Sequence, residues 1–127
     1  MPTIQQKPKS KTKLRSKLWK LFSEYVRRKE RGICYTCGKR DEWKYMQAGH
    51  FVHRDCLDYN EKNIHCQCVG CNKWRHGNLV EYADRLERDY GPGVIQELKK
   101  LGNEIKIWKI SELESMIEEY KIKLKKL

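Results

Sequence analysis

The sequence predicts a small α+β protein in which a short cysteine-rich core is flanked by α-helices. Two observations lead to this fold class. First, the chain of 127 residues contains two Cys-x2-Cys pairs, Cys34 with Cys37 and Cys68 with Cys71. Each pair places two thiolates on one tight turn, and two such turns complete the tetrahedral sulfur shell of a structural zinc ion. Second, apolar residues recur with helical spacing before and after this cysteine-rich stretch.

Positive charge is concentrated at the N-terminus. The net charge is +11; residues 1–32 hold 11 Lys and Arg against 2 acidic residues, whereas residues 33–127 hold 17 against 15. A basic arm on a nearly neutral body is typical of nucleic-acid-binding proteins, and a solvated tail that only aids solubility is the alternative. The candidate DNA-contacting residues are Lys9, Lys11, Lys13, Arg15, Lys17 and Lys20.

The sequence also indicates the cellular compartment of the protein. No apolar run reaches the about 18 residues of a membrane span, and residues 1–20 lack the apolar stretch and cleavage site of a signal peptide. The sequence therefore predicts a cytoplasmic protein with no membrane partner. Disulfides are rare in that compartment, so a metal ion is favoured over a disulfide framework as the partner of the cysteines.

The predicted organisation has three parts: a basic arm and helix over 1–32, the cysteine-rich core over 33–90, and helices over 91–127. The first helix starts near Lys13 and ends at Gly32, a suitable residue beyond a helix C-terminus. Its apolar face consists of Leu14, Leu18, Leu21, Phe22, Tyr25 and Val26.

The core should contain two short strands and a short helix. Residues 33–38 form a cysteine knuckle, and residues 42–47 are rich in the aromatic side chains that strands favour. A second strand is expected over 63–68, and a short helix from near Val69 or Asn72 to Gly77. The region 51–62 lacks helical periodicity and is expected to be a loop.

Capping patterns mark the later helices. Asn78 with Glu81, and Ser111 with Glu114, have the spacing of capping boxes. A further short helix is expected over 94–101, and residues 104–110 alternate as in an extended segment. The face of the last helix, which is expected either to pack on the core or to form a dimer interface, consists of Leu113, Ile117, Tyr120 and Leu124.

Four polar residues in and beside the core suit the hydrolysis of a phosphodiester. This reaction needs a base that activates water, a group that orients the base, and a cation on the phosphate. His50, at the end of the first strand, can be the base, and Asn63 can hold the histidine loop through amide hydrogen bonds. Asn72 and His76 are four residues apart, a spacing that puts two ligands of one divalent ion on the same face of a helix.

The order His50, Asn63, Cys68-x2-Cys71-Asn72 resembles the HNH, or ββα-metal, endonuclease motif with its zinc-ribbon cysteines. The strings CYTCG, QAGHF, NIHCQCVGCN and HGNLVEY look closer still to the phage NinG/Rap recombination family. This resemblance covers about residues 33–90. It implies a zinc-stapled, treble-clef-like ββα-metal core and a nuclease that cuts branched recombination intermediates such as Holliday junctions and D-loops. It also implies His50 as general base, Asn63 as the orienting residue, and Mg²⁺ or Mn²⁺ held by Asn72 and His76.

One position departs from that motif. Many HNH sites carry Asp or His immediately before the base, as a metal ligand, and this chain has Gly49 there. The metal ion is therefore expected either to have fewer protein ligands and more bound waters, or to take a ligand from His53 or Asp55. A cap of the short helix is the alternative role of His76. Cutting a four-way junction symmetrically needs two active sites, which makes a homodimer plausible. The rival hypothesis is a zinc-ribbon DNA-binding or recombination-accessory protein without enzymatic activity.

Three remaining residues are expected to have no direct part in the chemistry. His65 and Cys66 lie next to the second cysteine pair and are interpreted as packing groups. Cys56 is expected to be a free thiol in the loop.

Overall fold

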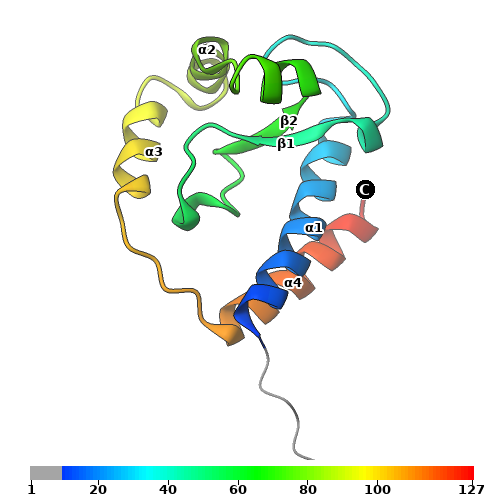
Figure 1. The fold of residues 1–127 in the computed structure, drawn as a ribbon, viewed down its shortest axis with the longest axis vertical. Helices are drawn as coiled ribbons and strands as arrows, with labels where there is room; N and C mark the ends of the chain where they lie inside the picture. Colours follow the sequence, from blue (N-terminus) through cyan, green and yellow to red (C-terminus); the bar gives the residue numbers. More distant parts are fainter. Residues whose placement is uncertain (1–9) are drawn as a thin grey trace, which may run out of the picture.

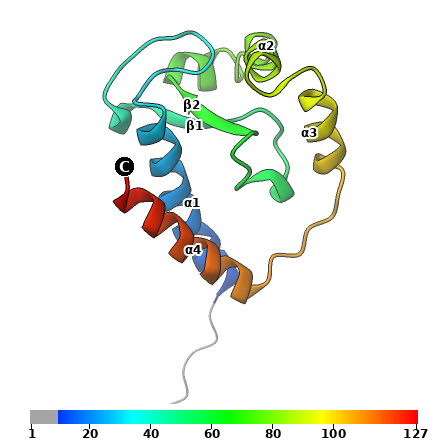
Figure 2. The same ribbon diagram turned by 180° about the vertical axis from the view of Figure 1, so that it is seen from behind.

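The computed structural model describes residues 10–127. Two strands lie near the centre, with α1 and α4 beside one another on one side and α2 and α3 on the other (Figures 1 and 2). The main elements are α1 (Lys11–Lys29), β1 (Gln47–His50), β2 (Ile64–Gln67), a π-helical turn η3 (Gly70–Trp74), α2 (Leu79–Tyr90), α3 (Val94–Gly102) and α4 (Ile110–Lys125). None of the helices in this described range is long and apolar enough to cross a membrane.

The first and last helices share one apolar core. Leu18, Phe22 and Val26 of α1 are buried as their spacing predicted. They form one cluster with side chains of α4 and of the sheet region, namely Tyr59, Ile64, Leu113, Ile117 and Tyr120. The predicted N- and C-terminal segments therefore make a single hydrophobic unit, and the apolar face of α4 packs on the core of its own chain.

The two strands form an antiparallel hairpin whose two faces have different neighbours. Gly49 pairs with His65, and His50 pairs with Ile64. Successive side chains of a strand point to opposite faces. His50 and Ile64 therefore face α1, where Ile64 joins the core of that helix. Gly49 and His65 face the cysteine turns and α2.

A second apolar cluster holds α2 and α3 against the loop that follows β1. It consists of Leu57, Tyr82, Leu86, Val94 and Leu98. The buried Tyr82 hydroxyl lies 2.8 Å from the carbonyl oxygen of Gly49 and 3.2 Å from that of Asn63. Burial raises the pKa of Tyr82, which keeps the hydroxyl proton available for donation. This contact fixes α2 to the strand end that carries His50.

Three local predictions were wrong. A 3₁₀ turn at Trp43–Tyr45 replaces most of the strand expected over 42–47, and β1 begins only at Gln47. Asn78 does not cap α2, because its backbone is left-handed at φ 48° and its amide lies instead 3.6 Å from the sulfur of Cys71. α4 is capped at Lys109, whose backbone N–H donates to the Glu112 carboxylate at 3.4 Å.

Residues 104–110 do not form a strand. In the described range the only sheet is the β1–β2 hairpin, so this connection has no strand to pair with. Ile105 and Ile107 are 96% and 72% exposed in it. The alternation of apolar residues was therefore not a sign of strand pairing.

Candidate functional site

The four paired cysteines meet as predicted. Cys34 and Cys37 come from the first knuckle, and Cys68 and Cys71 lie at the end of β2 and in η3. Their four sulfur atoms all lie within 4.8 Å of one another. The sulfurs of Cys37 and Cys68 are 3.7 Å apart, close to the roughly 3.8 Å edge of a tetrahedron with Zn–S bonds of about 2.3 Å. This cluster can hold one metal ion, and the sulfur separation leaves the cysteines unbridged.

The thiols of this cluster oppose one another's ionisation. Burial disfavours the thiolate of Cys34, but hydrogen bonds from Thr36 and from backbone amides outweigh it and lower its pKa to about 6. Burial, with the neighbouring sulfurs, raises the pKa of Cys37 to about 12. A divalent cation removes this conflict by neutralising several thiolates at once, so the donor set fits a zinc ion.

Two neutral side chains that the sequence analysis overlooked brace the cluster. Gln67 is fully buried, and its amide nitrogen donates to the carbonyl of Gly77 at 2.8 Å and to the hydroxyl of Thr36 at 3.1 Å. The Thr36 hydroxyl lies 3.4 Å from the sulfur of Cys34. Gln67 thus ties the first knuckle to the turn after η3. Neither residue is charged or part of a recurring spacing, so no sequence signal indicated this role.

His50 lies at the end of β1 in a network of side chains from three parts of the chain. Its Nε2 is 3.2 Å from a carboxylate oxygen of Asp58. The other oxygen of Asp58 accepts a hydrogen bond from Arg15 at 2.7 Å. The Trp19 ring stacks on the imidazole with centroids 5.1 Å apart, and His53 stacks on it at 5.2 Å. The sequence analysis missed Asp58 and Trp19, because 8 and 31 residues separate them from His50.

Asn63 holds the loop that follows His50. Its side-chain oxygen accepts from the backbone N–H of Val52 at 2.8 Å, and its nitrogen donates to the carbonyl of the same residue at 2.9 Å. Asn63 is fully buried, so loss of either bond would leave a backbone group without a partner at about 1–3 kcal/mol. These are the amide hydrogen bonds expected from the sequence, and the part of Asn63 in catalysis stays a prediction.

The helix face expected for Asn72 and His76 is absent. The π-helical turn ends at Trp74, and His76 follows it with a left-handed backbone at φ 50° and an exposed side chain. Asn72 donates to the side-chain oxygen of Gln47 at 2.7 Å and packs on the Gly49 face of the sheet, opposite to the face of His50. The predicted shared helix face is therefore not formed, and a role of either residue in binding a divalent ion stays a prediction.

Gly49 is closed to a metal-ligating side chain. A β-carbon placed there would collide with the side-chain oxygen of Gln67 and lie 2.9 Å from that of Asn72. In the described residues, the four-cysteine cluster is the one group of three or more His, Cys, Asp and Glu side chains close enough together to hold a metal ion. Asp55 is 84% exposed and His53 stacks on His50. Binding of Mg²⁺ or Mn²⁺ by these residues stays a prediction.

Comparison with known proteins places the chain among phage proteins. The family model described as bacteriophage lambda NinG protein matches residues 3–127. The chain belongs to the NinG family. It is 35% identical over 107 residues to protein ninG of Escherichia phage lambda, and 32% identical over 107 residues to protein ninG of Salmonella phage P22. Both alignments cover 81% of this chain and 52% of the relative, so the chain spans about half the length of these relatives. No solved structure matches it.

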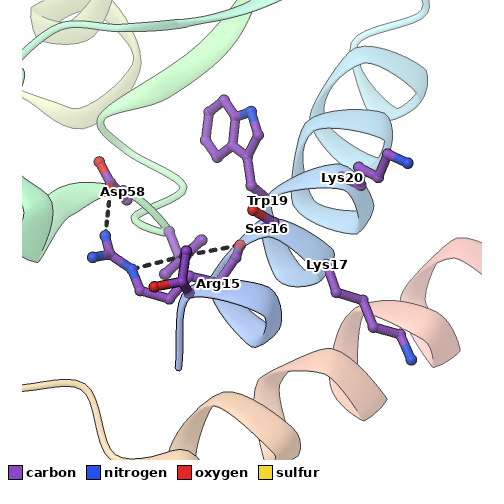
Figure 3. A pocket seen from close by; sticks show the side chains of 8 residues that line it. Arg15, Ser16, Lys17, Trp19, Lys20 and Asp58 are labelled. Atoms are coloured by element: carbon purple, nitrogen blue, oxygen red, sulfur yellow. Dashed lines mark hydrogen bonds and ion pairs between the residues drawn. The ribbon is translucent and has the colours of Figure 1, made fainter. Parts of the chain in front are cut away.

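The predicted DNA-contacting residues of this NinG-family chain have different surroundings. Lys11, Lys13, Lys17 and Lys20 are exposed on α1, and Lys9 lies outside the described residues. Arg15 is bound to Asp58 instead. Figure 3 shows Arg15 reaching toward Asp58 from α1, while Lys17 and Lys20 extend from the helix away from that pair. A groove of about 770 Å³ lies along this part of α1 and includes Trp19 and Asp58 in its lining.

Replacing Lys11, Lys13, Lys17 and Lys20 with Gln is expected to weaken binding to every DNA shape by a similar factor. Each phosphate contact contributes about 0.9 to the slope of log K against log salt, so the slope should fall by up to about 3 to 4. Substitution is preferable to deletion of the first 20 residues, because Leu18 is part of the core. Binding is measured over a salt series, with Lys99 and Lys100 of α3 replaced by Gln as the control. An unchanged slope would show that these lysines do not contact the DNA backbone.

Proposed function

We propose that this NinG-family chain is an endonuclease that hydrolyses DNA phosphodiesters in branched recombination intermediates such as Holliday junctions and D-loops. The observation that carries this proposal is the network of His50, Asp58 and Arg15. It places an imidazole held by a carboxylate beside a helix whose exposed face is basic. The structural metal of the four cysteines, proposed as zinc, supports the hairpin that carries this imidazole.

The contacts of His50 suit a general base. A proton on Nε2 is donated to Asp58, which leaves the lone pair of Nδ1 to accept a proton from water. The water oxygen then bonds to phosphorus while the bond to the departing DNA oxygen breaks. Asp58 is a positioning residue in this scheme, because it fixes the imidazole and does not itself touch the substrate. Asn63 contributes by keeping Val52, two residues after His50, in place.

Arg15 would stabilise the negative charge of the reacting phosphate. It shares the carboxylate of Asp58 with His50. Asn72 and His76 share no helix face, so the steps proposed here involve only His50, Asp58 and Arg15. The chain spans about half the length of its relatives, and its action on branched DNA is proposed. The internal packing of α4 means that a homodimer, if one forms on a junction, would use another surface.

A DNA-binding or recombination-accessory protein without catalysis is the second candidate. The observation in its favour is that, among the described residues, only the four cysteines form a group of three or more His, Cys, Asp and Glu side chains close enough to hold a metal ion. Such a protein would have no need for the contact between His50 and Asp58, because the carboxylate of Asp58 adds negative charge to a DNA-binding surface.

Incubation with linear, forked and four-way DNA distinguishes the two candidates. The endonuclease should cut the forked and four-way substrates faster than linear duplex when Mg²⁺ or Mn²⁺ is supplied. Binding is measured in parallel on the same substrates. Pure protein that binds branched DNA and cuts none of it with either metal would contradict the proposal and support the accessory protein.

A further inference from the structure

Trp74 differs from the other three tryptophans of the chain. Trp19 stacks on His50, Trp43 lies under the guanidinium of Arg27 at 5.1 Å, and Trp108 packs on Tyr59 at 5.1 Å. Trp74 is 78% exposed, and in the part of the chain that the structure describes it has neither a ring nor a cation partner. Large aromatic rings are usually well buried, so the position calls for an explanation.

The turn that carries Trp74 is rigid. Its neighbour Arg75 donates its backbone N–H to the carbonyl of Gly70 at 2.9 Å, and Gly77 donates to that of Cys71 at 2.9 Å. Cys71 is buried in the four-cysteine cluster, with its backbone N–H 3.4 Å from the sulfur of Cys68. The tryptophan is therefore presented from the metal-binding turn itself, which lowers the entropy lost when a partner binds to the ring.

The surroundings of Trp74 are cationic. Lys73 and Arg75 flank it, and both are exposed. Neither forms an ion pair with a carboxylate of the described residues, unlike Arg15, Arg28, Lys29, Lys62, Lys106 and Lys123. The sequence from residue 64 to residue 80 contains no acidic residue. This stretch of the chain therefore adds positive charge and no negative charge to the surface around Trp74.

We infer that Trp74, between Lys73 and Arg75, is a stacking site for the unpaired bases of single-stranded DNA. Bases offer their π-faces only where they are unpaired, and an aromatic ring beside cations binds base and phosphate together. The partner is a polyanion with flat apolar faces, which unpaired DNA supplies and the closed stack of a duplex does not. This inference rests on the proposed action on branched DNA, and it assigns to the metal-binding turn the contact with unpaired bases at a branch.

Binding measured without added Mg²⁺ or Mn²⁺ tests this site independently of cleavage. The ligands are an oligothymidylate of about 20 nucleotides, longer than the binding site of many small domains, and a blunt duplex of the same length. Trp74→Ala is expected to weaken oligothymidylate binding by roughly 5- to 150-fold, the range measured for one stacked base. Binding to the duplex should change by less than about 2-fold, because the ring makes no contact with paired bases.

Two further variants serve as controls for Trp74→Ala. Val80→Ala removes an equally exposed apolar side chain, at 78%, from α2 and should leave both affinities unchanged. Trp74→Phe keeps a stacking ring and should retain most of the affinity. It should also reduce the tryptophan fluorescence quenching by oligothymidylate, because Trp74 is the most exposed of the four tryptophans.

The inference is overturned if Trp74→Ala binds oligothymidylate as the unaltered protein does. It is also overturned if this variant, with its metal content intact, loses affinity for both ligands alike. Quenching that is undiminished in Trp74→Phe would have the same meaning. Failure of the cleavage assay with a positive binding result would instead count against the endonuclease alone.

Discussion

His50→Ala should lower the rate of DNA cleavage by roughly 100-fold or more, since a positioned general base supplies about 10²–10⁴. The side chain is 19% exposed, its ion-pair partner is Asp58, and it belongs to neither apolar cluster, so the fold and the bound metal should be retained. DNA affinity should stay nearly the same. The measurement is single-turnover cleavage of four-way DNA at saturating protein, with binding determined separately.

His53→Ala is the matched control for this variant. His53 stacks on His50, and burial lowers the pKa of His53, which favours its neutral form, so it adds little charge to the site. Its removal should change the cleavage rate by only a few fold. If His50→Ala cuts as fast as the unaltered protein, the general base is elsewhere and the mechanism proposed for His50 is wrong.

Asp58→Asn tests the positioning role within the same experiment. It preserves the shape of the side chain and removes the charge that holds His50 and Arg15. The variant should cut more slowly than the unaltered protein, and the same substitution should have little further effect when His50 is already alanine. Two independent effects would multiply instead, so the double variant separates positioning from a general loss of structure.

Cys34→Ser should cost the chain its metal and much of its stability. Structural zinc contributes about 10–16 kcal/mol to the folding of zinc-finger peptides, and Cys34 is one of four ligands and 1% exposed. The apolar clusters of α1 with α4 and of α2 with α3 remain, so we expect a large fall in melting temperature with residual helix. Metal analysis should give about one zinc per chain for the unaltered protein and close to none for the variant.

Cys56→Ser is the control for the loss of a cysteine. Its sulfur lies outside the four-cysteine cluster and donates to the carbonyl of Leu101 at 3.2 Å, a bond that a hydroxyl can also make. This variant should keep its zinc and its melting temperature within a few degrees. A folded Cys34→Ser protein with full zinc content, or an unaltered protein that folds without metal, would refute the structural site.

Local spacing was sufficient for several features of this protein. Each Cys-x2-Cys pair places its sulfurs on one turn whatever the rest of the chain does, so the sequence could indicate the four ligands. The apolar face of α1 was also recognisable, because helical periodicity depends only on neighbouring turns. Leu18, Phe22 and Val26 are buried as that periodicity predicted.

The candidate site depended on contacts that no spacing encodes. Asn72 and His76 have helical separation, but the left-handed backbone of His76 and the end of η3 at Trp74 set them apart. Asn72 packs beside Gly49. Gly49 and His50 are successive residues of β1, so their side-chain positions lie on opposite faces of the hairpin.

The sequence by itself therefore determined the cysteine cluster, the main helices and the basic face of α1. Only the tertiary structure decided that Asp58 holds His50, that Arg15 is an internal partner of Asp58, and that Gln67 fills the space beside Gly49. The physical reason is one of range. Backbone periodicity and turn geometry are fixed by residues a few positions apart, whereas hydrogen bonds and excluded volume depend on which distant side chains the packed core brings together.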